Sequence, residues 1–423
     1  MVRRIKLPLG WINRDGKLII VSRGLCSLAQ SSVAIILALY LNKLGFSLVQ
    51  IGAFLSAGVA GSACLAFIVS LIAEKVGRRR LLVIFTLLSG AAGLALVFIN
   101  DFLPLMLVAF LGSITGTGIL PTQPLKQASL ADTVPSPKRT DLFATYRIVS
   151  LAGNALGALA AGLPILLQNA FALSEIHAYK AMFIGFAFFL LVATLLYNLL
   201  SPSIEVSHSE QRWVNPMRLP SRRLIFTLTG LFSLDHFAGS LFMQSLAAYW
   251  FYTRFGLELE SLALIFFLSD ILAAISLWVA AKLGNLIGLI NTMVFTHIPS
   301  SLLLIATTFA PSAGLAVFFW QVRAFLNSMD VPTRDSYIMS VVRPNERVAM
   351  AGIHIVGRNV SGTIGPSVAT ALWQAFSANV PIIGCAILKI TYDLSLYFMF
   401  RKVKTPQEIA KIRANSLAQP GTP

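Results

Sequence analysis

Apolar runs long enough to cross a lipid bilayer recur along the whole chain, and short polar loops separate them. The first run extends from Leu18 to Leu41, and about 20 residues of helix span a hydrocarbon core of roughly 30 Å. Hydrophobic residues make up 56% of the chain and charged residues only 12%, whereas about a quarter of the residues of a soluble domain are charged. Because backbone groups in lipid must bond to one another, runs of this length predict helices. We therefore expect an all-α integral membrane protein.

The apolar runs predict twelve transmembrane helices. We expect them near residues 18–41, 47–72, 81–99, 103–131, 144–167, 180–200, 224–252, 261–282, 292–310, 314–341, 349–374 and 380–400.

One segment is repeated half a chain apart, since residues 126–157 align without a gap with residues 334–365. The alignment pairs Pro124 with Pro332, Lys126 with Arg334, Arg139 with Arg347, and Gly157 with Gly365. Chains built from two copies of one helical unit are common among secondary transporters, which bind substrate between the copies. We expect a six-helix half at residues 1–200, a cytoplasmic linker at 201–223 that contains three prolines, and a six-helix half with a short cytoplasmic tail at 224–423.

The net charge of +16 is distributed unevenly between the two sides of the expected helices. Twenty-three Lys and Arg residues fall on the side of the termini, whereas the other side has only Lys43, Lys180 and Arg254. Cytoplasmic loops are the basic ones, so we expect both termini in the cytoplasm. The charge therefore indicates orientation and contact with anionic lipid headgroups, and we expect no nucleic-acid partner.

The turn between the second and third expected helices carries one acid among four bases. It contains Glu74, Lys75, Gly77 and the run Arg78 to Arg80. Gly77 permits a tight turn. A carboxylate near a helix N-terminus, with arginines facing the acid of another helix, forms a latch that can break and re-form.

This turn resembles the signature loop of the major facilitator superfamily, in which Gly-x-x-x-Asp-Arg/Lys-x-Gly-Arg-Arg/Lys joins helices two and three. Lys75, Gly77, Arg78 and Arg79 match it, whereas Ser70 replaces the first glycine and Glu74 replaces the aspartate. The resemblance implies the twelve-helix fold of that superfamily in two pseudo-symmetric halves, and transport by alternating access. It also implies gating roles for all of these matched residues, with Glu74 facing the start of the eleventh helix and Arg78 paired with Asp132.

Charged residues inside the expected helices are candidates for a functional site, because a charge at bilayer depth costs about 3 kcal/mol unless it is paired or hydrated. Arg323, Asn327, Asp330 and Arg334 recur every three or four residues, which places them on one face of the tenth helix. In the resembling superfamily this helix lines the central cavity. The first three have no charged counterparts in the first copy, so we expect Arg323, Asn327 and Asp330 to bind substrate. A structural ladder with an Asp330–Arg334 pair is the alternative, and we expect a structural or gating role for Arg334.

Asp235 and His236 lie in the seventh helix, a second cavity helix by the same resemblance. A carboxylate in a cavity of low dielectric can exchange protons, so we expect Asp235 and Asp330 to couple transport to protons. A packed polar pair that holds two helices together is the alternative.

The other intramembrane charges have structural interpretations. We expect Arg23 to extend toward the headgroups and Asp270 to pair with Arg358. We also expect Lys389 and Asp393, four residues apart in a peripheral helix, to pair with each other.

These observations predict a secondary transporter for a small organic solute, coupled to protons by symport or antiport. The solute could be anionic, because Arg323 would attract such a group. The alternatives are efflux of amphipathic toxic compounds, which the 29 phenylalanines favour, a lipid flippase, or a transporter-like receptor. No motif of a membrane enzyme is present, so we expect no enzyme activity and no cofactor. Cys26, Cys64 and Cys385 all lie in apolar runs and suggest neither a disulfide framework nor a metal site. We expect a monomer in a prokaryotic cytoplasmic (inner) membrane.

Overall fold

The computed structural model describes residues 12–115, 122–131, 133–134, 138–205, 219–343, 346–401 and 403. All the regular elements in these ranges are helices, as expected. Nine helical segments of the described part are long and apolar enough to cross a membrane. Each of the twelve expected segments contains at least one described helix, and the number of membrane crossings stays a prediction.

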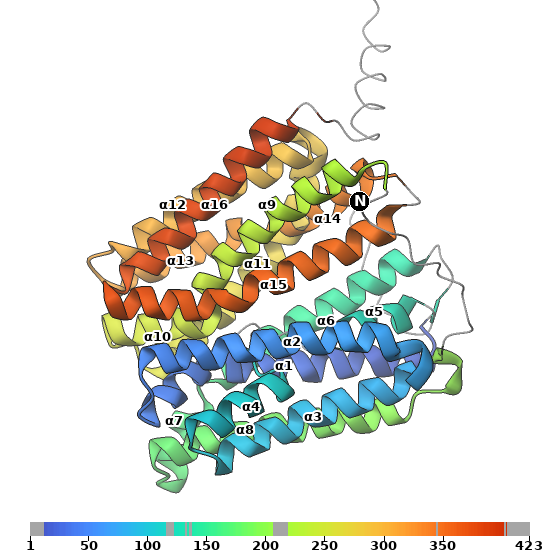
Figure 1. Cartoon of the computed structure of the whole chain (residues 1–423). Helices are drawn as coiled ribbons and strands as arrows, with labels where there is room; N and C mark the ends of the chain where they lie inside the picture. Colours follow the sequence, from blue (N-terminus) through green and yellow to red (C-terminus); the bar gives the residue numbers. More distant parts are fainter. Residues whose placement is uncertain are drawn as a thin grey trace, which may run out of the picture. The chain divides into compact units, whose positions relative to one another are not determined.

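The chain forms two compact units, of which the first comprises Met1–Gln211 and Met243–Phe267. Its helices are α1 (Arg14–Lys43), α2 (Leu48–Val76), α3 (Arg78–Phe98), α4 (Phe102–Gly112), α5 (Gln123–Ala131), α6 (Arg139–Ala160), α7 (Leu163–Phe171), α8 (Glu175–Asn198), α10 (Gln244–Phe255) and the short η3 (Pro202–Ile204). The central helix is α1, which packs against α6, α8 and α10 (Figure 1). Residues 33–41 of α1 are buried at every position, so this helix forms the core of the unit.

The second unit comprises Arg212–Phe242 and Leu268–Pro423. Its helices are α9 (Arg222–Leu241), α12 (Leu289–Thr308), α13 (Ala313–Asn327), α14 (Asp330–Val341), α15 (Arg347–Ala375) and α16 (Asn379–Phe400), and α11 (Leu259–Ile287) continues into it from the first unit. Helix α9 packs against α15 and α16, and α12 packs against α13, α14 and α16 (Figure 1). Each unit thus consists of two separate stretches of the chain, so the units do not coincide with the two halves expected from the sequence. The two sequence halves stay a prediction.

Four expected helices are interrupted. The segment 314–341 divides into α13 and α14 at Ser328 and Met329, and Pro332 explains this break because it has no N–H to donate to the carbonyl of Ser328. Pro164 acts in the same way between α6 and α7, because its missing N–H would have bonded to Ala160, where α6 ends. The expected segment 103–131 contains the separate α4 and α5. The segment 224–252 divides into α9 and α10, and no proline lies at that point.

The sequence repeat recurs in the helix boundaries. Helix α6 begins at Arg139 and α15 begins at Arg347, which are the residues that the alignment pairs. Gly157 of α6 lies so close to α1 that an added Cβ would overlap the carbonyl group of Leu28, and a Cβ added to Gly365 of α15 would overlap the side chain of Ser240 on α9. Small residues permit such close packing of membrane helices. The repeated glycines therefore mark the same helix contact in both units.

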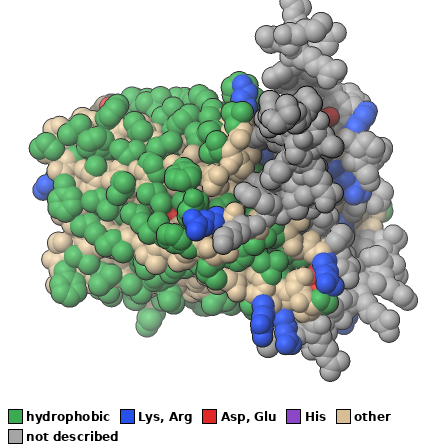
Figure 2. Space-filling view, turned by 90° about the horizontal axis from the view of Figure 1, so that it is seen from above, with side chains coloured by type: hydrophobic (Ala, Val, Ile, Leu, Met, Phe, Trp, Pro, Cys, Tyr) green, Lys and Arg blue, Asp and Glu red, His purple; other side chains and the backbone are tan. Residues whose placement is uncertain are grey.

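The described helices expose many hydrophobic side chains on the face that Figure 2 shows. Phe98, Leu103 and Leu286 have at least 75% of their surface exposed. A soluble protein rarely exposes apolar patches of such extent. This surface is the one expected of helices that face lipid.

Gly157→Ala is expected to lower the melting temperature, because the new methyl group would displace α6 from α1. Gly185→Ala is the matched control, since no atom lies within 4 Å of its added Cβ. Alanine favours a helix over glycine by about 1 kcal/mol, so this control should melt at the same or a higher temperature. Thermal unfolding in detergent, followed by tryptophan fluorescence, measures both. Equal melting temperatures would contradict the close contact.

Candidate functional site

A buried carboxylate, Asp235 of α9, joins two cations of the second unit. Its Oδ2 lies 3.1 Å from Nη1 of Arg334 on α14, and its Oδ1 lies 2.8 Å from Nζ of Lys389 on α16. The same Nη1 of Arg334 lies 3.1 Å from Oδ2 of Asp330, one turn earlier on α14. All four side chains are less than 10% exposed. Ion pairs in such a buried place are screened little by water.

The network continues from Lys389 to a histidine and a third carboxylate. Nζ of Lys389 lies 3.2 Å from Nε2 of His297 on α12, and Nδ1 of His297 lies 3.0 Å from the carboxylate of Asp393. Asp393 is fully buried. We call these six residues, Asp235, His297, Asp330, Arg334, Lys389 and Asp393, the charge network.

Apolar and aromatic side chains surround the charge network. Phe232, Met293, Tyr337 and Tyr392 belong to the buried core formed by α9, α12, α14 and α16. The guanidinium of Arg334 lies 5.7 Å from the ring centre of Phe232. This core keeps water away, so each charge depends on its partners within the network.

The charge network is electrically neutral when it holds one additional proton. It contains three carboxylates, one guanidinium and one ammonium group, which gives a net charge of −1 when His297 is neutral. A single proton on His297 or on a carboxylate makes the network neutral, and neutrality is favoured where water is excluded. The chain of contacts from Asp235 through Lys389 and His297 to Asp393 joins groups that can exchange a proton.

Only part of the expected stripe on the tenth helix belongs to the charge network. Asp330 and Arg334 pair as the structural alternative predicts, but they lie on α14, whereas Arg323 and Asn327 lie on α13. Arg323 is half-buried, and its guanidinium stacks on the ring of Trp320, 4.7 Å from the centroid. Oδ1 of Asn327 is buried without a hydrogen-bond partner among the described residues. The four residues therefore do not share one continuous helical face.

Two pairings expected from the sequence are wrong. Lys389 and Asp393 do not pair with each other, because Asp235 and His297 from facing helices occupy them. Asp270 forms no ion pair with Arg358 among the described residues, and its Oδ2 is buried there without a hydrogen-bond partner. Asp235 contacts Arg334 of α14 and Lys389 of α16, which agrees with the alternative that polar groups here hold two helices together.

The expected position of Arg23 is also wrong. Its side chain is 8% exposed and bonds to residues of α5 and α6, so it does not extend toward the headgroups. Sequence position near a helix end does not show whether neighbouring helices offer polar partners.

The turn between α2 and α3 has the left-handed backbone that its glycine predicts. Gly77 has a φ of 98°, a conformation that other residues rarely adopt. The carboxylate of Glu205 accepts hydrogen bonds from the backbone N–H groups of Arg78 and Arg79, at 2.6 and 3.3 Å. A carboxylate at a helix N-terminus is stabilised by the helix dipole. Glu205 is a residue that sequence analysis missed, because no local spacing marks an acid 127 residues away.

The remaining gating residues are described only in part. The side chain of Glu74 and the whole of Asp132 lie outside the described residues, so the pairing of Arg78 with Asp132 stays a prediction. Lys75 lies exposed in the last turn of α2. The guanidinium of Arg79 bonds to the side chain of Asn198, at 3.1 Å.

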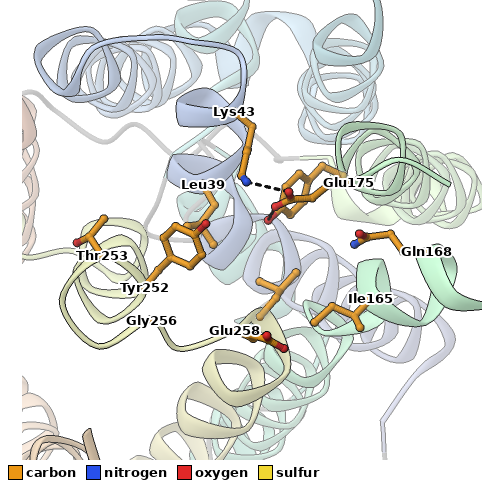
Figure 3. A pocket seen from close by; sticks show the side chains of 11 residues that line it. Leu39, Lys43, Ile165, Gln168, Glu175, Tyr252, Thr253, Gly256 and Glu258 are labelled. Atoms are coloured by element: carbon orange, nitrogen blue, oxygen red, sulfur yellow. Dashed lines mark hydrogen bonds and ion pairs between the residues drawn. The ribbon is translucent and has the colours of Figure 1, made fainter. Parts of the chain in front are cut away.

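A cavity of about 650 Å³ lies in the first unit at the ends of α1, α7 and α10 and the starts of α8 and α11. An ion pair crosses it, with 2.8 Å between Nζ of Lys43 and Oε2 of Glu175 (Figure 3). Tyr179 also donates a hydrogen bond to Glu175, at 3.2 Å. The charged side chains of Lys43 and Glu175 are 35% and 40% exposed, so this pair is far better hydrated than the charge network.

Comparison with known proteins places this architecture in a family. The family model of the Major Facilitator Superfamily matches residues 19–366. The chain belongs to this superfamily. It is a membrane transporter by family and fold, and not an enzyme.

Relatives of this superfamily member include solved structures and one curated protein. The chain is 23% identical to the uncharacterized membrane protein YJR124C of Saccharomyces cerevisiae, over 92% of this chain and 94% of that protein. It is similar to the nucleoside transporter NupG, with a TM-score of 0.73 and 15% identity over 92% of this chain and 99% of that one. It is also similar to a D-xylose-proton symporter, with a TM-score of 0.71 and 13% identity over 90% of this chain and 97% of that one.

The comparisons support a multi-pass integral membrane protein. The curated relative comes from yeast, so it gives no support to the expected prokaryotic membrane. The cytoplasmic position of the termini stays a prediction.

Lys389→Met is expected to destabilise the protein by about 3–5 kcal/mol, because it leaves the buried Asp235 with one cation fewer. Lys43→Met is the matched control and should cost about 1 kcal/mol or less, because its pair with Glu175 is exposed. The free energy of unfolding, from denaturant titration in mixed micelles, measures the difference. Adding Asp235→Asn to Lys389→Met should recover part of the loss, and equal costs for the two single variants would contradict the network.

Proposed function

We propose that the protein is a proton-coupled secondary transporter that moves a small organic solute by alternating access. Its membership of the superfamily and the similarity to transporters support solute transport. One of the similar structures is a D-xylose-proton symporter, which is consistent with proton coupling.

The observation that carries the coupling proposal is the one-proton charge balance of the charge network. Asp235 and Asp330, the carboxylates expected from the sequence, share Arg334. His297 and Asp393 provide a second place for the proton, 3.0 Å apart. When the network loses its proton it carries an uncompensated negative charge in an apolar core, which favours a rearrangement of α9, α14 and α16.

The proposed solute contacts in the second unit are Arg323, Asn327 and Asp330. Arg323 makes no ion pair with a described carboxylate, and Oδ1 of Asn327 is without a described partner. Arg323 would attract an anionic or polar group, and Asn327 would orient it. Gating is proposed for Gly77, Arg78 and Arg79, with Glu74, Lys75 and Asp132 as the expected partners. The proposed partners are the solute, protons and membrane lipids. The protein is proposed to act as a monomer.

Asp393→Asn is expected to abolish proton movement, because the loss of one carboxylate leaves the network neutral without a bound proton. Proteoliposomes loaded with a pH-sensitive dye would be challenged with a panel of nucleosides, pentoses and organic acids. The wild-type protein should change the internal pH when a transported solute is added. Asp393→Asn should retain exchange of radiolabelled solute across the membrane without the pH change.

Asp330→Asn tests the coupling role expected from the sequence in the same vesicles. Asp101→Asn is the control, because Asp101 is exposed and lies outside the charge network. It should behave as the wild-type protein does. Unchanged solute-driven pH changes in both Asp393→Asn and Asp330→Asn would overturn the coupling proposal.

A further inference from the structure

The first unit contains a fully buried lysine that has no carboxylate partner among the described residues. Lys126 of α5 has none of its surface exposed. Its Nζ lies 3.7 Å from Sγ of Cys26 and 5.4 Å from the ring centre of Tyr197. A thiol and an aromatic ring leave most of an ammonium charge uncompensated, and such a charge at bilayer depth is costly.

A second buried cation lies nearby, and its partners among the described residues are also neutral. Nε of Arg23 donates to Oγ of Ser150 at 2.9 Å, and its Nη1 donates to Oε1 of Gln123 at 3.0 Å. Its guanidinium lies 5.8 Å from the ring centre of Tyr146. Arg23 and Lys126 are connected through α1, because Cys26 lies one turn after Arg23.

The described carboxylates of the first unit are engaged or located elsewhere. Asp15 accepts hydrogen bonds from Ser201, and Glu175 pairs with Lys43. Glu205 caps α3. The others that are described are exposed, namely Asp101, Asp141, Glu258 and Glu260. No described carboxylate contacts Arg23 or Lys126.

The repeat shows what the second unit has at these positions. Lys126 aligns with Arg334, and Thr122 aligns with Asp330. Lys126 contacts Cys26 of α1, whereas its counterpart Arg334 contacts Asp235 of α9. The second unit therefore neutralises its cation with two carboxylates, whereas the first has a thiol and a threonine in their places.

Unsatisfied polar groups accompany the two cations. Arg23, Cys26, Ser27 and Gln30 share one face of α1, at spacings of three and four residues. Nε2 of Gln30 is buried and donates to no described residue, and Oγ1 of Thr122 is buried without a hydrogen-bond partner in the described part of the chain. Two positive charges and a free amide donor are groups that bind an anion, and a guanidinium matches a carboxylate or phosphate with two parallel hydrogen bonds.

We propose that Arg23 and Lys126 form a binding site for the anionic group of the transported solute, a carboxylate or a phosphate. This rests on the proposed function as a solute transporter and names the chemical class of its solute. The anion supplies the charge that the two carboxylates supply in the second unit.

Lys126→Met tests the proposal without a solute. Removal of an uncompensated buried charge should raise the melting temperature of the purified protein by about 2 °C or more. Lys43→Met is the matched control and should leave it nearly unchanged, because Lys43 is partly exposed. A lower melting temperature for Lys126→Met would mean that Lys126 is a structural residue, and it would overturn the proposal.

Added anions test the site directly. The melting temperature of the wild-type protein would be measured in sodium succinate, sodium benzoate and inorganic phosphate, with sodium chloride at equal ionic strength as the reference. At least one anion should raise it by about 2 °C or more, and phosphate against the two carboxylates distinguishes the group that is bound. The uncharged succinamide and benzamide should have no effect, and the shift should vanish in Arg23→Gln and Lys126→Met. No anion-dependent shift, or an equal shift in these variants, would overturn the site.

Different experiments would overturn the proton-coupling proposal and the anion-site proposal. Binding in detergent needs no proton gradient, so Asp393→Asn should retain the anion-dependent shift even though it abolishes proton movement. A protein that couples solute to protons but shows no anion-dependent shift would keep the proposed function and lose the anion site.

Discussion

Asp235 is the carboxylate on which the packing of the second unit depends. It holds Arg334 of α14 and Lys389 of α16 against α9, in a core where water does not compensate charge. Each of these cations would be costly alone, and the carboxylate would be costly without them. The position of three helices is therefore tied to the ionisation of one side chain, which is the physical condition for coupling a proton to a movement.

The two units share their helix packing but differ in the charges that they bury. The close glycine contacts and the starts of α6 and α15 recur at repeated positions, so the helix packing is shared. Arg334 has Asp235 and Asp330 beside it, whereas Lys126 lies beside the thiol of Cys26 and the ring of Tyr197. Packing glycines can be inherited by both copies of a duplicated unit, while a single substitution is enough to change the charge of a buried position.

The sequence predicted the helical class, the segments that contain helices, the turn at Gly77 and the pair of Asp330 with Arg334. These depend on hydrophobicity and on contacts within a few residues. Lys389 and Asp393 were expected to pair because they lie four residues apart, but Asp235 and His297 on other helices offer shorter contacts. Arg23 was placed wrongly for the same reason. Which faces of two distant helices meet cannot be read from one sequence.

The carboxylate of Glu205 fixes more than the start of α3. Glu205 immediately precedes residues 206–218, and the backbone N–H of Ser221, shortly after them, donates to Glu346 at 3.2 Å in the second unit. The chain between the units is thus fastened by one carboxylate at each end. Each end of this chain is therefore fixed to the start of a helix, α3 in the first unit and α15 in the second.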